Sequence, residues 1–421
     1  MSPTPLAAAL LALVALAAFV LPPAVAVLAA GGVLAAAAAD ARMARRRPRI
    51  VRELPAVLSR GVPVGLRVRV EAPPAVTVRV RQAVPQALAL EPREGDGGLE
   101  AELLPRRRGR HVVPAVGTRS VGPLRLGAWY ARAGDPGEVS VFPDLLTARR
   151  LALTVRQGRY RDQGISARGP LGLGTDFELV RDYLPDDDIR QVNWRATARL
   201  GRPMSNQYRV EQDRDVMLVL DAGRLSAAPL PAGASGVRPT VLDACLDALT
   251  AVALVVDEVG DRCGAIAFDR EVRRTLQPGR QGGGEVVRTL FDCQPRMVDS
   301  DFELAFRRVG GAKRAFVLVL CDLLEEAAAR PLVEAIPVLT RRHAVVVASP
   351  ADPGVAALAS RPPAGEGDLA RAAVAVDVLA ARTRAAALVR AAGAAFVEAP
   401  ADRLPRACVT AYLRAKSRGR L

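Results

Sequence analysis

The sequence is poor in the residues from which many reaction centres are built. It has only two histidines, His111 and His343, and aromatic residues make up 4% of the chain. A histidine-based triad or a multi-histidine metal site therefore has little to build from. The five cysteines include no Cys-x-x-Cys pair, which argues against a disulfide framework or a zinc knuckle. Cys263 and Cys321 stand in apolar runs, so we expect buried thiols in a reducing compartment.

Lysine is also scarce, because Lys313 and Lys416 are the only lysines among 59 basic residues. The cationic surface is thus almost entirely guanidinium, a bias typical of a GC-rich bacterial genome. The net charge of +15 favours anionic partners such as acidic phospholipid, nucleic acid or an acidic protein, without choosing among them. A length of 421 residues with 50% hydrophobic content predicts two to three folded domains rather than a disordered chain.

Two apolar runs without charged residues lie near the N-terminus, at residues 6–21 and 24–39, and they meet at Pro22 and Pro23. Each run is shorter than the roughly 20 residues that a spanning helix needs. Together they predict a transmembrane helical hairpin within residues 1–41, with a single kinked span as the alternative. The first residues carry none of the positive charge that precedes the apolar stretch of a signal peptide, so we expect no cleavage.

A basic juxtamembrane segment is predicted over residues 42–53. Its arginines are Arg42, Arg45, Arg46, Arg47, Arg49 and Arg52. Positive charge at this place holds the chain on the cytoplasmic side of the cell membrane. The same arginines either contact anionic headgroups or act only as a stop-transfer flank.

Short strands with alternating apolar and polar residues follow, between Val64 and Val141. A period of two with Gly and Pro between the strands predicts antiparallel sheet, and we expect a small β-sandwich over residues 54–148. Arginines alternate with valines in two of these strands and form a basic face. That face is either a binding surface or the solvated side of a two-faced sheet. The basic cluster at residues 106–110 lacks interleaved aromatics, which argues against nucleic-acid binding.

Apolar strands alternate with helical segments in the second half of the chain. The strands are expected at residues 216–221, 263–268, 316–322, 344–347 and 394–397. Strands that are apolar throughout and separated by helices predict an α/β fold with a mostly parallel sheet covered on both faces. The ligand crevice of such folds lies at the carboxyl ends of the strands, where Asp221 and Asp322 stand.

A long motif precedes this layer. Residues 174–199 run GTDFELVRDYLPDDDIRQVNWRATAR and resemble the signature of the bacterial family catalogued as domain of unknown function 58. Asp186 stands where the family pattern has glycine, and Asn193 where it has aspartate. The residues themselves suggest either a charge-paired clamp that fixes this segment on the sheet or a docking surface for a partner. The residues concerned are Arg181, Tyr183, Asp187, Arg190, Asn193, Trp194 and Arg199.

The resemblance implies a von Willebrand factor A-like (Rossmann-type) domain over residues 215–421. The signature and a linker, residues 149–214, would join it to the β module and the membrane hairpin. Domains of this type hold Mg²⁺ through Asp-x-Ser-x-Ser, a threonine and a further aspartate. The matching positions are Asp221, Gly223, Leu225, Ser226, Ser300 and Asp322.

This metal motif is degenerate, because Gly223 and Leu225 replace both serines. Ser226 stands one place late and Ser300 stands where the threonine would. Arg224 could neutralise the carboxylates in place of a metal. We therefore expect no metal and no other cofactor, with Mg²⁺ as the less favoured alternative.

These features predict a membrane-anchored, non-enzymatic adaptor or scaffold that docks partner proteins. No pairing of a nucleophile with a base is recognisable. The resemblance implies a MoxR-type AAA+ ATPase as partner, in a chaperone-like assembly system. The alternative is a membrane-tethered basic protein that binds anionic lipid or nucleic acid, for which steep loss of binding with salt is diagnostic.

Overall fold

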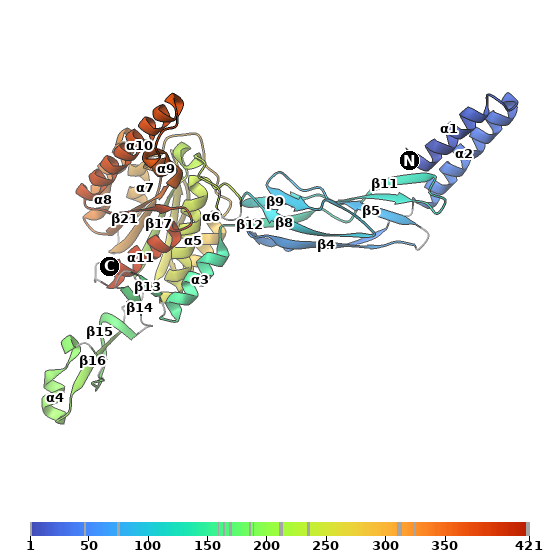
Figure 1. Cartoon of the computed structure of the whole chain (residues 1–421). Helices are drawn as coiled ribbons and strands as arrows, with labels where there is room; N and C mark the ends of the chain where they lie inside the picture. Colours follow the sequence, from blue (N-terminus) through green and yellow to red (C-terminus); the bar gives the residue numbers. More distant parts are fainter. Residues whose placement is uncertain are drawn as a thin grey trace. The chain divides into compact units, whose positions relative to one another are not determined.

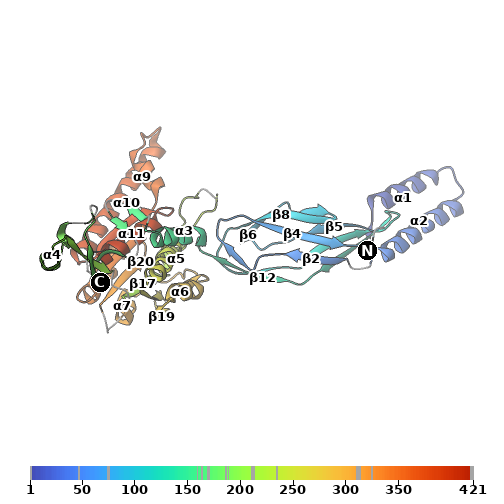
Figure 2. The same ribbon diagram turned by 90° about the horizontal axis from the view of Figure 1, so that it is seen from below.

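The chain divides into two compact units, Met1–Phe142 and Pro143–Leu421. The computed structural model describes residues 2–417 except 46–47, 74–75, 159, 163–164, 168–170, 185–186, 188, 210–213, 234–235, 310–313 and 324–325. The first unit contains the apolar helices and most of the antiparallel strands. The second contains a six-stranded sheet with helices, and the fold as a whole is mixed α/β with several sheets (Figures 1 and 2).

The predicted apolar runs form two helices, α1 (Pro5–Ala17) and α2 (Pro23–Met43), which run side by side (Figure 1). Each helix has proline in its first turn, where a missing N–H costs nothing. The Thr4 side chain caps α1 by accepting the N–H of Ala7. Among the described residues, α2 is the one helix that is long and apolar enough to cross a membrane.

Three sheets in the first unit share one apolar core. The five-stranded sheet has the order β1 (Ser2–Pro3), β11 (Gly127–Ala133), β10 (Val116–Val121), β5 (Thr77–Arg81) and β7 (Glu94–Asp96). The four-stranded sheet has the order β2 (Arg49–Glu53), β4 (Val64–Glu71), β8 (Gly98–Pro105) and β6 (Leu88–Glu91). The three-stranded sheet has the order β3 (Val57–Ser59), β12 (Gly137–Phe142) and β9 (Gly109–Val113). The segment predicted as juxtamembrane thus includes β2, a strand of the module.

The alternating arginines of β4 and β5 lie on the solvent side and face acidic residues of neighbouring strands. The pairs are Arg67–Glu100, Arg69–Glu53, Arg79–Asp96 and Arg81–Glu94, with N···O distances of 2.7 to 3.5 Å. The valines between them are buried in the core, as a two-faced sheet requires. This arrangement favours the solvated-side interpretation of the basic face, because most of its charge is balanced across the strands.

The sheet of the second unit has the order β19 (Val272–Arg280), β18 (Arg262–Phe268), β17 (Asp215–Asp221), β20 (Ala315–Leu320), β21 (Ala344–Ala351) and β22 (Ala395–Pro400). All neighbouring strands are parallel except β19, an antiparallel edge strand that the sequence did not predict. Every residue of β20 is buried, which explains its unbroken apolar run.

Helices cover both faces of this sheet. One face packs against α7 (Phe302–Val309), α8 (Glu326–Thr340) and α10 (Glu366–Ala391) in a single core. The other carries α5 (Val241–Val259) and α11 (Leu404–Ser417), where Tyr412 contacts Phe316 edge to face at 5.5 Å. The helices α6 (Gly282–Leu290) and α9 (Pro353–Ser360) also belong to this unit.

Helix α3 (Leu145–Arg156) belongs to the second unit, so the β module ends at Phe142 rather than at residue 148. The cause is an apolar stripe of α3, Ala148, Ala152 and Val155, which is buried. The Asp144 N–H also donates to the carboxylate of Asp247 at 2.8 Å, which ties the start of α3 to α5.

The signature segment forms a separate two-stranded arm. Strands β15 (Leu171–Asp182) and β16 (Met204–Arg209) pair antiparallel, and the turn η1 (Ile189–Gln191) and helix α4 (Trp194–Leu200) lie between them. A second hairpin, β13 (Tyr160–Asp162) and β14 (Ile165–Ala167), precedes it. The clamp alternative, in which this segment is fixed on the large sheet, gains no support from the strand pairing, because its strands pair with each other outside the six-stranded sheet.

Candidate functional site

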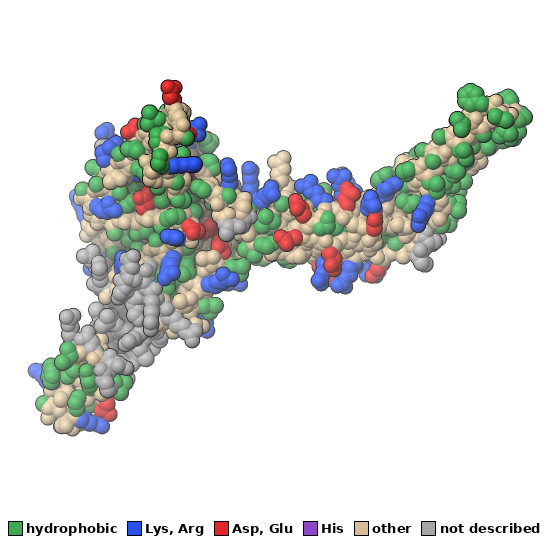
Figure 3. Space-filling model, viewed as in Figure 1, with side chains coloured by type: hydrophobic (Ala, Val, Ile, Leu, Met, Phe, Trp, Pro, Cys, Tyr) green, Lys and Arg blue, Asp and Glu red, His purple; other side chains and the backbone are tan. Residues whose placement is uncertain are grey.

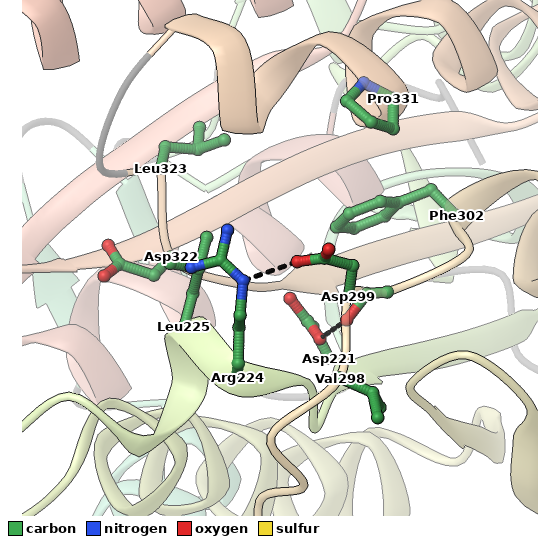
Figure 4. A pocket seen from close by; sticks show the side chains of 10 residues that line it. Asp221, Arg224, Leu225, Val298, Asp299, Phe302, Asp322, Leu323 and Pro331 are labelled. Atoms are coloured by element: carbon green, nitrogen blue, oxygen red, sulfur yellow. Dashed lines mark hydrogen bonds and ion pairs between the residues drawn. The ribbon is translucent and has the colours of Figure 1, made fainter.

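A cavity of about 320 Å³ opens at the carboxyl ends of the parallel strands (Figure 4). Three neighbouring strands each end in an aspartate there: Asp221 in β17, Asp269 directly after β18, and Asp322 shortly after β20. The side chains of Asp221 and Asp322 line the cavity. Sequence analysis identified these two and missed Asp269, although an aspartate directly after a predicted strand was the available signal.

Asp221 is held by groups of the chain itself. It is 3% exposed, and it accepts the N–H of Gly223 at 2.8 Å and the hydroxyl of Ser300. The Ser226 hydroxyl donates to the Gly223 carbonyl at 2.6 Å, so it is engaged in the turn. Leu225 lines the cavity and offers no oxygen.

Gly223 has no room for the serine that the metal motif would place there. A Cβ atom at this position would lie 2.1 Å from the Ser300 hydroxyl oxygen and 2.9 Å from the Val298 carbonyl. The Ser300 hydroxyl thus fills the space of the missing side chain and bonds to Asp221 itself. The residues do not fit an octahedral Mg²⁺ site, because the motif's hydroxyl positions are lost or engaged. Within the described part of the chain, no three His, Cys, Asp or Glu side chains gather to hold a metal ion.

Asp322 is paired with Arg382, a residue of α10 that sequence analysis did not identify. The N···O distance is 3.1 Å, and the two side chains are 5% and 11% exposed. The guanidinium also donates to the Glu398 carboxylate at 2.9 Å, the Pro350 carbonyl at 2.7 Å and the Ser349 hydroxyl at 3.2 Å. Four acceptors around one planar fork fix its position between α10 and the sheet.

Arg224 does not neutralise the crevice carboxylates, which corrects our prediction for it. Its guanidinium pairs with Asp299 at 2.5 Å, on the rim of the cavity, where the Asp299 side chain is 84% exposed (Figure 4). Asp299 lies 75 residues away in the chain, but the Arg224 N–H donates to the Val298 carbonyl at 2.9 Å, which brings the two side chains together. The cation that pairs with Asp322 is Arg382.

Asp269 is buried, and two arginine side chains lie farther from its carboxylate than hydrogen-bond distance. Its carboxylate accepts the N–H of Glu271 at 3.0 Å, and Arg273 and Arg296 approach it at 3.6 and 3.8 Å. Two carboxylates, those of Asp221 and Asp322, thus line the crevice, and Arg224 lines it as well. Burial raises the pKa of Asp322, against the opposing effect of Arg382.

Burial likewise raises the pKa of Asp221 to about 6. The folded protein then binds this proton more tightly than the unfolded chain does, so its contribution to stability is present near pH 4 and is lost as the pH rises through 6. We expect Asp221→Asn to raise the free energy of unfolding at pH 7 by about 3 kcal/mol, and the gain to shrink towards pH 4. Urea unfolding at several pH values measures this difference. The exposed Asp299→Asn is the control, and a gain for Asp221→Asn that is equal at every pH would contradict the account.

The signature residues stabilise the arm from within. Arg181 makes two hydrogen bonds to Asp187, at 2.6 and 2.8 Å, and the Tyr183 hydroxyl donates to the Asp187 carbonyl at 3.2 Å. Asn193 caps α4 by accepting the N–H of Ala196 at 2.9 Å, which explains why an amide suffices in place of the family aspartate. The side chain of Arg190 lies outside the described residues, as does Asp186.

The arm also exposes large apolar side chains. Trp194 is 68% exposed and Ile189 69%, and Leu184 and Leu200 are more than half exposed. Arg199 is exposed on the same helix as Trp194. Sequence analysis placed Trp194 in either a clamp or a docking surface, and its exposure favours the docking surface.

The predicted membrane-flanking arginines have different surroundings. Arg42 and Arg45 are exposed, and Arg45 lies over the Trp129 ring at 5.4 Å. Arg49 lies 3.7 Å from Glu71. Arg52 instead stabilises the β module, because it donates to the Pro114 and Asp135 carbonyls at 2.8 and 2.7 Å. Arg46 and Arg47 lie outside the described residues.

Fold and site together define a mixed α/β protein with an N-terminal apolar helix and a carboxylate-floored crevice. Residues 179–392 match the model of the family described as "Protein of unknown function DUF58", and the chain belongs to this family. "Uncharacterized protein Rv1480" of Mycobacterium tuberculosis and "Uncharacterized protein Mb1516" of Mycobacterium bovis are each 30% identical to it over 308 residues. That match covers 66% of this chain and 92% of each relative.

Two solved structures show slight similarity. One is a superoxide reductase (neelaredoxin) from Ignicoccus hospitalis, with 14% identity and a TM-score of 0.15, covering 24% of this chain and 85% of that one. The other is an uncharacterized membrane spanning protein from Vibrio fischeri, with 14% identity and a TM-score of 0.17, covering 48% and 98%. At these TM-scores neither similarity supports an inference about fold or function.

Proposed function

We propose that this protein is a membrane-anchored, non-enzymatic adaptor that docks partner proteins. Its α/β domain is of the von Willebrand factor A-like (Rossmann-type) class, and its first partner is a MoxR-type AAA+ ATPase. In this proposal the apolar helices anchor the chain in the cell membrane. The exposed Arg42 and Arg45 at the end of α2 favour placement of the domains on the cytoplasmic side.

The observation that carries the proposal is the exposed apolar surface of the arm. Leu184, Ile189, Trp194 and Leu200 all lie within the short segment between β15 and β16, and each is more than half exposed. Exposed apolar groups of this size mark interaction sites, and tryptophan is enriched among the residues that dominate binding energy. The Arg181–Asp187 pair holds the segment in shape without a partner.

The residues that line the crevice favour a role in binding a partner rather than in catalysis. Its lining includes neither histidine nor lysine among the described residues, and the Ser300 hydroxyl donates to the Asp221 carboxylate. The rim combines the exposed Arg224–Asp299 pair with Leu225, Leu323 and Pro331. Such a mixed rim around a fixed floor suits a short segment of a partner protein, as a second contact beside the arm.

The alternative function, charge-driven binding of lipid or nucleic acid, receives less support. The arginines of β4 and β5 are balanced by acidic residues across the strands. Pairing of this kind reduces the number of cations available to neutralise phosphates.

Affinity purification from gently solubilised membranes, with and without ATP, tests the proposal. We expect the native protein to enrich a MoxR-type AAA+ ATPase, identified by mass spectrometry, and Trp194→Ala with Ile189→Ala to lower that enrichment at least fivefold. Leu369→Ala, a change at an apolar residue of α10 that is 60% exposed, is the control and should have no effect. Absence of the ATPase from the native sample, or equal enrichment by all three proteins, would contradict the proposal.

A further inference from the structure

Both ends of the helical hairpin are fixed at one end of the β module. Before α1, Ser2 and Pro3 pair with Ala128 and Gly127 of β11. Next, the Thr4 N–H donates to the Leu126 carbonyl at 3.0 Å, and its hydroxyl donates to the Arg125 carbonyl at 2.5 Å. The chain therefore enters α1 on the same side of any membrane as the module.

The end of α2 is fixed to the same loop. Asp40 is fully buried, and its carboxylate accepts the N–H groups of Leu124 at 3.0 Å and of Leu126 and Gly127 at 2.9 Å. A Cβ atom on Gly127 would lie 2.3 Å from the Ala37 carbonyl, so the last turns of α2 lie directly against β11. The chain returns from α2 to the side from which it left.

The free part of each helix is too short for a bilayer. Helix α1 has 13 residues, which span about 20 Å at 1.5 Å per residue. In α2, the stretch before the contact at Ala37 also spans about 20 Å. The hydrocarbon core of a membrane is about 30 Å thick. The free parts of the two helices are therefore about equally long, and neither is long enough to reach the opposite surface of the membrane.

The tip of the hairpin, residues 18–22, contains no polar side chain that water could solvate. Between α1 and α2 the chain reads Ala-Phe-Val-Leu-Pro over residues 18–22, and Phe19 and Val20 are 90% and 89% exposed. Figure 3 shows apolar side chains over the visible face of the hairpin up to its tip. By contrast, the chain at the base of the hairpin carries exposed Arg42, Arg45 and Tyr130, the residue types that gather at headgroups.

We infer that the hairpin is re-entrant: it enters one leaflet, turns within the hydrocarbon core, and returns to the same face. The occupant of its exposed apolar surface is the acyl chains of lipid, and the basic and aromatic base lies at the headgroups. This inference rests on the membrane anchoring proposed above and adds that no segment of the hairpin reaches water on the far side.

Cysteine labelling of the full chain in native membranes tests the topology. The five native cysteines are buried, and burial raises the pKa of Cys245, Cys263, Cys321 and Cys408, so background reaction with maleimide is low. We expect Phe19→Cys to resist an impermeant maleimide from both sides and to react only after detergent. Val112→Cys, exposed on β9, is the control that marks the side of the module.

Labelling of Phe19→Cys from the side opposite Val112→Cys would overturn the re-entrant topology and leave membrane anchoring intact. Release of the protein by carbonate, with Phe19→Cys labelled without detergent, would instead overturn the anchoring itself. A second variant, Val20→Arg, should lower membrane retention several-fold, because it places a charge in hydrocarbon. Leu124→Arg at the base is its matched control and should retain the native level. Unchanged retention of Val20→Arg in anchored protein would also contradict a buried tip.

Discussion

Replacing Arg382 with methionine should lower the free energy of unfolding by about 3–5 kcal/mol, the range for removing one partner of a buried ion pair. The change leaves Asp322 as a buried carboxylate without its cation, and its side chain is only 5% exposed. It also removes the donor for Glu398 and for the Pro350 carbonyl. Urea unfolding of the detergent-solubilised protein measures the loss, with hydrogen exchange of the β20 and β21 amides as the probe of unfolding.

The matched control is Arg224→Met, which removes the same chemical group from a residue that lines the cavity. Its partner Asp299 is 84% exposed, so we expect a cost below about 1 kcal/mol. Adding Asp322→Asn to Arg382→Met should recover part of the stability, because the uncompensated charge is then gone. Equal costs for the two arginine variants would contradict the role assigned to Arg382.

Asp40→Ala should detach the end of α2 from the β module, at a cost of about 3 kcal/mol. Three backbone N–H groups, those of Leu124, Leu126 and Gly127, would lose their one charged acceptor in a buried site. We expect amide hydrogen exchange in residues 124–127 to accelerate by about two orders of magnitude.

The control for Asp40 is Arg42→Ala, a change in the last turn of the same helix at an exposed position. It should leave exchange in the loop unchanged. Native protection in Asp40→Ala would show that packing at Gly127, rather than the carboxylate, holds the helix, and it would weaken the case for a fixed hairpin base.

Local patterns account for what could be predicted of the fold. Three features can be recognised from consecutive residues alone. They are the apolar hairpin, the two-residue period of β4 and β5, and the unbroken apolar run of β20. The crevice at Asp221 and Asp322 followed from the same patterns, because the carboxyl ends of parallel strands share one edge.

Residues that act over long sequence distances could not be predicted. Arg382 reaches Asp322 across 60 residues, and Asp40 reaches Gly127 across 87. Nothing near Arg382 distinguishes it from the other arginines of a basic helix. Arg224, in contrast, looked like the natural partner of Asp221 because it is close in sequence, yet the backbone of its turn directs it to Asp299. Proximity in the chain is a poor guide where several arginines compete for several carboxylates.

The most direct test of the adaptor account is equilibrium binding of the purified full chain, held in detergent or nanodiscs, to the purified MoxR-type AAA+ ATPase of the same cell. The account predicts saturable binding that persists at physiological salt and is weakened at least fivefold by Trp194→Ala with Ile189→Ala. Absence of binding with ATP and with ADP would contradict it. Retention only of anionic lipid or nucleic acid, lost between 50 and 200 mM salt, would assign the function to the arginine surface instead.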